Sequence, residues 1–178
     1  MNTYSAGIAL VLSVAACFGS CADAADKTIT NKHNGFEITF PASWVATELP
    51  DGRAIGVSKA SQRGDDWAND KSSVTVEVKK MTEGATLKDL LAERNTPEMR
   101  QHKGSTYKPE VYTKIAGVDA CKITVLVDSP ARTCVNYLLV SGGRSYVIST
   151  NAPTETYDQF SATLEAVIKS FKLIEAKK

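Results

Sequence analysis

The clearest alternation of apolar and polar positions lies near the C-terminus. Between Pro153 and Phe171, apolar side chains recur at spacings of three, four and seven residues. They are Tyr157, Phe160, Leu164, Val167, Ile168 and Phe171. This spacing forms one stripe on an α-helix, and Pro153 suits a first helical position. The pattern predicts an amphipathic helix over residues 153–171.

Two short stretches before this helix predict a β-hairpin. Residues 135–140 and 146–150 are rich in β-branched and aromatic side chains, and Ser141-Gly142-Gly143-Arg144 joins them. Paired glycines supply the positive φ angles of a tight hairpin turn. A hairpin that leads into a one-faced helix predicts a core made of a sheet and a helix.

Alternating apolar and polar residues predict further strands upstream. They cover residues 36–40, 54–59, 74–79, 110–115 and 118–127, with 27–31 as a short edge strand. Trp44 follows the strand 36–40 and is expected to fill the core. Asp128-Ser129-Pro130 predicts a turn into the final hairpin. Consecutive strands with short turns indicate an α+β fold with an antiparallel sheet of about six strands.

A short helix is predicted between the two halves of this sheet. Thr86 suits an N-cap, and Leu87, Leu90 and Leu91 follow it at helical spacing. Pro97 is expected to lie near the end of the helix.

The start of the chain predicts a secretory signal. Residues 6–18 are almost wholly apolar, too few to span a membrane, and are followed by small residues. Cleavage after Ala24 would remove residues 1–24 as a signal peptide and leave a soluble periplasmic protein. Val14-Ala15-Ala16-Cys17 instead resembles a lipobox, which would remove residues 1–16, lipidate Cys17 and leave Cys21 as an unpaired thiol. Both routes remain open, and both predict export.

Residues 25–178 are predicted to form a single domain, because this length suits one hydrophobic core. The 21 Lys and Arg residues nearly balance the 20 Asp and Glu residues of the full chain. No net field therefore attracts nucleic acid, and membrane contact is expected only through a lipid anchor.

Sequence motifs of catalysis are absent. His33 and His102, the two histidines, have no neighbouring Cys, His or spaced carboxylates, and no Gly-x-Ser-x-Gly occurs. Gly142-Gly143 has no following Lys-Ser/Thr, so it predicts a turn and not a phosphate site. We therefore predict neither catalytic residues nor a cofactor, and a hydrolytic enzyme is the most remote alternative.

One acidic stretch carries the weak candidates for a metal and a partner surface. Asp65, Asp66 and Asp70 could offer oxygen ligands to calcium, but the stretch lacks the glycine and terminal Glu of an EF-hand. A solvated acidic loop is the simpler interpretation. Trp67 within it would suit a partner surface, or would fold back onto the sheet.

Cys121 and Cys134 are the candidate disulfide. An oxidising compartment favours a bridge. If the hairpin turns about Pro130, however, Cys121 faces Leu139 and Cys134 faces Leu126, on opposite faces of the sheet. A bridge would then need a bulge or a displaced turn. Otherwise both side chains are small buried hydrophobes.

The run Asn34-Gly35-Phe36-Glu37-Ile38-Thr39-Phe40-Pro41-Ala42-Ser43-Trp44 resembles the opening of PsbP-like domains. The order of predicted elements over residues 28–174 is also similar to that family, which includes the PsbP subunit of photosystem II and bacterial envelope proteins similar to the DcrB lipoprotein. The resemblance implies an α-β-α sandwich with helices on both faces of the sheet. It also implies an accessory or assembly role beside an envelope protein partner, with no catalytic residue to carry over. A small-ligand or calcium-binding module is the alternative.

Overall fold

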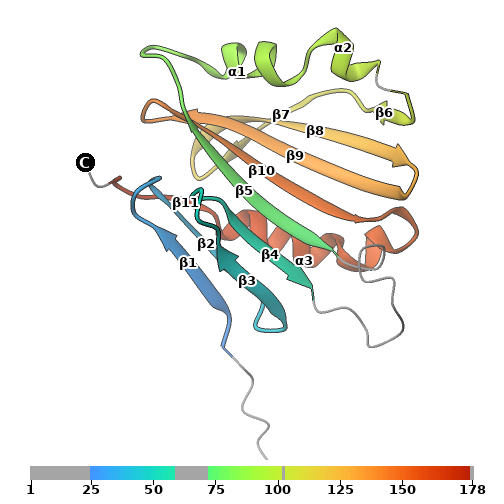
Figure 1. Ribbon diagram of the computed structural model, residues 1–178, viewed down its shortest axis with the longest axis horizontal. Helices are drawn as coiled ribbons and strands as arrows, with labels where there is room; N and C mark the ends of the chain where they lie inside the picture. The colour runs from blue at the N-terminus through green and yellow to red at the C-terminus, as the bar shows by residue number, and fades with distance from the viewer. Residues whose placement is uncertain (1–24, 59–71, 102, 177–178) are drawn as a thin grey trace, which may run out of the picture.

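A twisted antiparallel sheet of eight strands forms the centre of the molecule (Figure 1). The structure is a computed structural model that describes residues 25–58, 72–101 and 103–176. The strands of this sheet are β3 (Trp44–Glu48), β4 (Ala54–Ser58), β5 (Ser73–Lys80), β6 (Ser105–Tyr107), β7 (Val111–Ile115), β8 (Val118–Asp128), β9 (Ala131–Ser141) and β10 (Arg144–Pro153). Their order is β3-β4-β5-β10-β9-β8-β6, and β7 also pairs with β8.

A second, three-stranded sheet joins the two ends of the described chain. β2 (Phe36–Phe40) lies at its centre and pairs with β1 (Lys27–Asn31) on one side and β11 (Lys172–Leu173) on the other. The prediction of one sheet with about six strands is therefore wrong in number, although every strand pairing is antiparallel as predicted.

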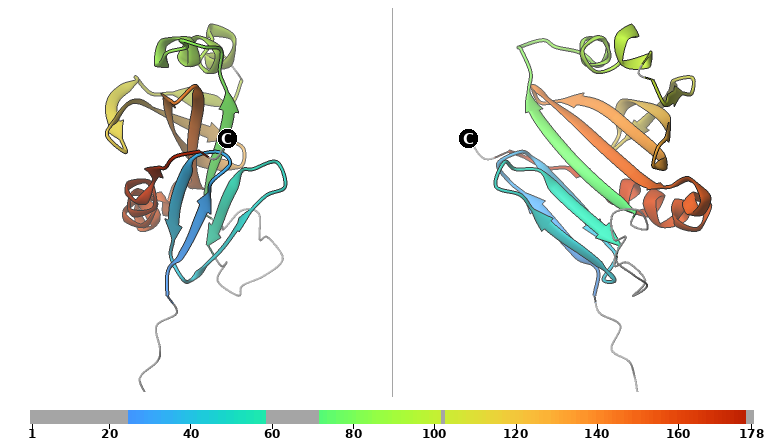
Figure 2. Two further views of the ribbon diagram at one scale, coloured as in Figure 1. Left: turned by 90° about the vertical axis from the view of Figure 1, so that its left-hand side faces the viewer. Right: turned by 45° about the vertical axis from the view of Figure 1, so that its right-hand side comes forward.

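Two helices cover opposite faces of the large sheet (Figure 2). Ala120 of β8 and Leu139 of β9 belong to the cluster under α3 (Tyr157–Ser170), whereas their neighbours Cys121 and Leu138 pack with Leu90 of α1 (Leu87–Arg94). Successive side chains of a strand point to opposite faces. The pleat of β8 and β9 therefore separates a large core from a smaller one.

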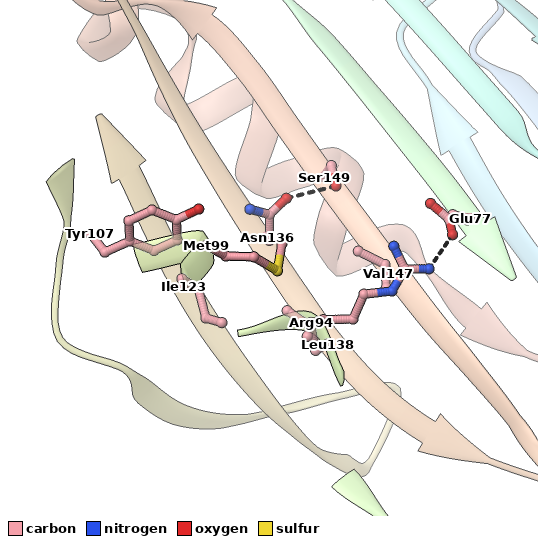
Figure 3. Close-up of a pocket in the computed structure, with 9 residues that line it drawn as sticks. All are labelled: Glu77, Arg94, Met99, Tyr107, Ile123, Asn136, Leu138, Val147 and Ser149. Atoms are coloured by element: carbon pink, nitrogen blue, oxygen red, sulfur yellow. Dashed lines mark hydrogen bonds and ion pairs between the residues drawn. The ribbon is translucent and has the colours of Figure 1, made fainter. Parts of the chain in front are cut away.

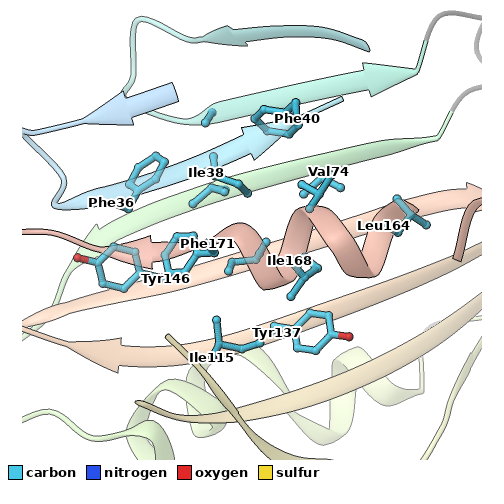
Figure 4. Close-up of a cluster of buried hydrophobic side chains, with 14 of the residues drawn as sticks. Phe36, Ile38, Phe40, Val74, Ile115, Tyr137, Tyr146, Leu164, Ile168 and Phe171 are labelled. Atoms are coloured by element: carbon cyan, nitrogen blue, oxygen red, sulfur yellow. The ribbon is translucent and has the colours of Figure 1, made fainter. Parts of the chain in front are cut away.

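The larger core lies between the two sheets and α3 (Figure 4). Phe36, Phe40 and Phe171 are almost completely buried. The ring of Phe171 stacks on Phe36 at 5.9 Å between centroids and meets Tyr146 edge-on at 5.8 Å. The last turn of the chain thus packs against one of its first strands.

The C-terminal helix is confirmed, but it begins later than predicted. Pro153 is the last residue of β10, and a 3₁₀ turn, η1 (Thr154–Thr156), precedes α3. β10 continues past the predicted end of the strand because it pairs with β9 as far as Pro153. The stripe itself is correct, since Leu164, Val167 and Ile168 are buried in the core.

The helix after Thr86 is also confirmed. The Asp89 carboxylate accepts hydrogen bonds from the Thr86 backbone N–H at 2.8 Å and from the Thr86 hydroxyl at 2.7 Å. A second short helix, α2 (Pro97–Arg100), begins where α1 was expected to end. Trp44 is buried as predicted, but it opens β3. No helix in the described ranges has the length and apolar character needed to cross a membrane.

The two cysteines lie on the same face of the sheet, and not on opposite faces as predicted. Cys121 pairs with Leu138, and Cys134 pairs with Val125. Ser129 and Pro130 form a two-residue turn, which shifts the pairing by one position and reverses the face of Cys134. Both thiols are free, and four residues along a strand separate their positions by about 13 Å. This separation is too long for a bridge.

Candidate binding pocket

A pocket of about 180 Å³ lies between the α1–α2 segment and the large sheet (Figure 3). Its lining combines polar and apolar side chains from both helices and the strands beneath them. They are Glu77, Arg94, Met99, Tyr107, Ile123, Asn136, Leu138, Val147 and Ser149.

The sheet registers assemble the floor of this pocket. Ser149 pairs with Asn136, and Asn136 pairs in turn with Ile123 on the next strand. Val147 lies between Glu77 of β5 and Leu138 of β9. Paired residues of an antiparallel sheet share a face, so these side chains all point toward α1.

The roof is the chain from Arg94, the last residue of α1, to Met99 of α2. The Thr96 hydroxyl caps α2 by accepting a hydrogen bond from the Met99 N–H at 3.3 Å. Asn95 donates to Glu110 at 2.5 Å, and Arg100 forms an ion pair with the same carboxylate. These contacts fasten the roof to the chain just before β7.

Charges inside the pocket are compensated. An Arg94 guanidinium N–H donates to the Glu77 carboxylate, and the two form an ion pair. Next to them, the Lys79 ammonium donates to Glu93 at 2.6 Å and lowers the pKa of that carboxyl. Arg94 Nε is buried and lies 3.9 Å from Glu93 Oε1, which is an ion-pair contact, but none of the described residues accepts a hydrogen bond from it. The pocket is therefore nearly neutral while one buried donor is unfilled.

Two further groups keep hydrogen-bonding capacity. The Ser149 hydroxyl donates to Asn136 Oδ1 at 2.7 Å, which fixes the amide and leaves its NH₂ group directed into the pocket (Figure 3). The Tyr107 hydroxyl points toward the same amide. Met99, Ile123 and Leu138 supply apolar walls. An arrangement of this kind can bind a small polar group that has an apolar portion.

His33 lies in a separate hollow of about 290 Å³, which Glu48 and Asp51 also line. Both carboxylates have partners, since Asn31 donates to Glu48 at 2.9 Å and Arg53 donates to Asp51 at 2.8 Å. Among the described residues, no Ser, Thr or Cys lines this hollow. The hollow therefore places a histidine near two carboxylates, but its lining supplies no nucleophile.

Most of the sequence-predicted site residues lie outside the described part of the chain. They are Cys17, Asp65, Asp66, Trp67 and Asp70; His102, which was not predicted to belong to a site, also lies outside. The metal, lipid-anchor and partner-surface hypotheses therefore stay predictions. Among the residues that the structure describes, no group of three or more His, Cys, Asp or Glu is placed to hold a metal ion.

Comparison with known proteins identifies the family. Residues 26–173 match the sequence model of PsbP. The chain belongs to the PsbP family. This confirms the resemblance of the sequence to PsbP-like domains. No curated protein matches the sequence.

Solved structures of the same fold include two PsbP-like or envelope-associated proteins. The solution structure of the cyanobacterial PsbP, CyanoP, of Synechocystis sp. PCC 6803 is 13% identical with a TM-score of 0.59, and the match covers 87% of this chain and 96% of CyanoP. LpqN, involved in cell envelope biogenesis of Mycobacterium tuberculosis, is 13% identical with a TM-score of 0.59. This match covers 84% of this chain and 91% of LpqN. A point mutant of protein Mog1 is 16% identical with a TM-score of 0.54, and the match covers 85% of this chain and 97% of Mog1.

Sequence patterns alone do not single out the pocket of this family member. Asn136 carried a usable signal, because it interrupts an apolar strand and the predicted hairpin places it opposite Ser149. Arg94 carried no such signal. Its partner Glu77 lies 17 residues away on another element, and only the packed structure brings them together.

Proposed function

We propose that this PsbP-family protein is an exported, non-enzymatic accessory protein that acts by binding. Its pocket between α1–α2 and the sheet holds an uncharged polar group, such as an amide, of an envelope protein or of a small molecule. The observation that carries this proposal is the Arg94–Glu77 ion pair inside the pocket, beside the buried Arg94 Nε and the Asn136 NH₂ group that the Ser149 hydrogen bond directs into the pocket.

Charge compensation favours an uncharged ligand. A carboxylate in the pocket would meet Glu77, and an ammonium would meet Arg94, so either charge would oppose the existing pair. A carbonyl oxygen can accept from Asn136 or Arg94 without disturbing it. The volume of about 180 Å³ equals about six water molecules in the liquid, which suits one amide group with a few carbons.

Export and the accessory role rest on two separate grounds. The apolar segment at residues 6–18 supports a secretory signal. The fold is that of CyanoP and of LpqN, a protein involved in cell envelope biogenesis. A soluble or lipid-anchored periplasmic protein that contacts an envelope partner fits both grounds.

Binding is tested by nuclear magnetic resonance with three small probes: N-methylacetamide, acetate and methylammonium. We expect N-methylacetamide to shift the Asn136 side-chain amide and the Arg94 Nε–H signals in a saturable manner, with a Kd of about 1 mM or weaker. Acetate and methylammonium should leave both signals in place. Equal effects of all three probes, or no effect of N-methylacetamide, would refute the proposal that this pocket binds an uncharged polar group.

A matched pair of variants shows whether the effect belongs to the pocket. Asn136→Leu keeps the volume and removes the amide, so the N-methylacetamide response should disappear. Thr47→Val changes an exposed residue on the border strand β3, away from the pocket lining, and should leave the response intact.

Export is tested by the intact mass of the protein recovered from its native envelope. A chain that begins at Ala25 indicates a soluble periplasmic protein, and an acylated Cys17 indicates a lipoprotein. A protein that retains residues 1–24 and stays in the cytoplasm would refute export.

A further inference from the structure

β7 forms an exposed border of the large sheet. It pairs with β8 on one side, and no described residue pairs with its other side. Four of its five residues are exposed, and Val111 and Tyr112 retain 54% and 68% of their surface. Beside this border, Tyr112 also lines a hollow of about 420 Å³ with Leu87 and Leu91 of α1.

This border is prepared for strand pairing. The outer edge of a strand presents backbone N–H and C=O groups that can pair with another strand. Val111, Tyr112 and Thr113 have high β propensity. Ala116 and Gly117, both with positive φ, form the two-residue turn that holds β7 against β8. The backbone of β7 is thus already in an extended conformation in the single chain.

The charged side chains along β7 would complement those of a second copy of the same strand. In an antiparallel pair of two β7 strands centred on Tyr112, Glu110 of each copy lies opposite Lys114 of the other. Val111 then lies opposite Thr113, and the two Tyr112 residues lie side by side. A two-fold axis repeats each contact, so this register gives two ion pairs around an aromatic pair on one face. A register centred on Thr113 would forfeit both ion pairs.

The side chains that would form these pairs also have partners within their own chain. Glu110 is 25% exposed; its Oε1 accepts from Asn95 and Arg100, and among the described residues its Oε2 accepts a 3.3 Å hydrogen bond from the Tyr112 hydroxyl. Lys114 is 68% exposed and contacts Asp119 of its own chain at 2.6 Å. Pro109, which has no N–H to donate, would lie at the end of the paired segment and limit its length.

We infer that β7 pairs edge to edge with β7 of a second copy of this chain, in the antiparallel register centred on Tyr112. This inference is independent of the pocket proposed above. A single short strand buries much less than the roughly 1,200 Å² of a stable complex. The protein is therefore in a monomer–dimer equilibrium that depends on its concentration.

Charge reversal tests the register by sedimentation equilibrium of the full exported protein. The wild type should shift from one chain to two as its concentration rises. Lys114→Glu alone and Glu110→Lys alone each place like charges opposite one another twice, and each should weaken the dimer at least about tenfold. An equimolar mixture of the two variants restores both ion pairs and should dimerise again, as should the double variant Glu110→Lys/Lys114→Glu.

Lys80→Glu is the control, because it makes the same change of charge on the exposed end of β5. It should dimerise as the wild type does. Thermal melts verify that every variant is folded, and Lys114→Glu keeps the test valid if Glu110→Lys unfolds, because Lys114→Glu leaves the contact of Glu110 with Arg100 intact. A monomer at all concentrations, or a dimer that charge reversal does not weaken, would overturn the inference.

Cross-linking tests the same register by a second route. Facing α-carbons in an antiparallel pair lie about 4.5 to 5.5 Å apart, within reach of a disulfide. Cys121 pairs with Tyr112 within the chain and would form an intrachain bridge with a cysteine there, so both cross-linking variants are made in a Cys121→Ala background. Tyr112→Cys should then give a covalent dimer under oxidising conditions. Val45→Cys, on the opposite border strand and similarly exposed, should remain a monomer. A covalent dimer of Val45→Cys alone would assign the contact to β3 and overturn the inference.

Discussion

The ring of Phe40 lies directly over the backbone of Gly56. A Cβ atom at residue 56 would come within 2.1 Å of Phe40 Cδ1 and 2.3 Å of Cε1. Phe40 is the last residue of β2 in the small sheet, and Gly56 is the middle residue of β4 in the large one. The absence of a side chain at this one position lets the two sheets approach each other.

Gly56→Ala should therefore destabilise the fold by about 3 kcal/mol, since the added methyl group overpacks a full core. Urea unfolding measures the change. Gly142→Ala has open space around it but a positive φ of 56°, so it should cost only about 1 kcal/mol. Adding Phe40→Leu to Gly56→Ala should recover at least about 1 kcal/mol relative to the sum of the single changes. Strict additivity would contradict the contact.

Ser170 joins α3 to the small sheet. Its hydroxyl accepts a hydrogen bond from the Thr39 N–H at 2.9 Å, and the Thr39 carbonyl lies 3.1 Å from it. Ser170→Ala leaves a backbone N–H unpaired and should cost about 1–2 kcal/mol in unfolding free energy. Ser161→Ala removes an exposed hydroxyl that contacts only its own helix, and should cost less than about 0.5 kcal/mol. Equal losses in the two variants would contradict this role.

Tyr146 should make the unfolding free energy depend on pH in the alkaline range. Its hydroxyl donates to the Asn34 carbonyl at 2.9 Å, and burial raises the pKa of the folded state above the usual value of about 10. Tyr146→Phe should cost about 1 kcal/mol at neutral pH. The contribution of Tyr146 is complete below the unfolded-state pKa and is lost as the pH rises toward the folded-state pKa. The stabilities of the two proteins should therefore converge above about pH 10. A constant difference from neutral to alkaline pH would contradict the raised pKa.

The two free thiols should react slowly and unequally. Burial raises the pKa of both Cys121 and Cys134, and thiolate is the reactive form. Cys121 is fully buried and Cys134 only partly, so alkylation of the native protein should reach Cys134 first. Peptide masses after timed alkylation give both rates, and urea should make them equal. Resistance of both cysteines in urea until a reductant is added would indicate a disulfide and contradict this structure.

Local patterns were sufficient to predict most elements of the fold. The glycines at 142 and 143 correctly predict the turn between β9 and β10, and Thr86 correctly predicts the start of α1. β3 escaped prediction, because the small residues Ala46 and Thr47 give its alternation little contrast. The pairing of β8 with β9 differed because Ser129 and Pro130 together form the turn, a shift too small for a sequence pattern to detect.

The pocket was harder to predict than the fold. Its floor depends on the registers of four strands, and its roof on a four-residue helix whose signal is only Thr96 before Pro97. A one-residue shift of any strand would exchange the pocket-lining side chains for core residues. Nothing local in the sequence relates Arg94 to Glu77, so their ion pair required the full structure.

The small sheet sets the order in which this molecule can be completed. β2 precedes every strand of the large sheet, but its second neighbour, β11, follows α3. One edge of β2, and the space that Phe171 fills beside it, stay open until residues 171–173 have been synthesised. The nascent polypeptide therefore cannot close its main core before the segment after α3 is available.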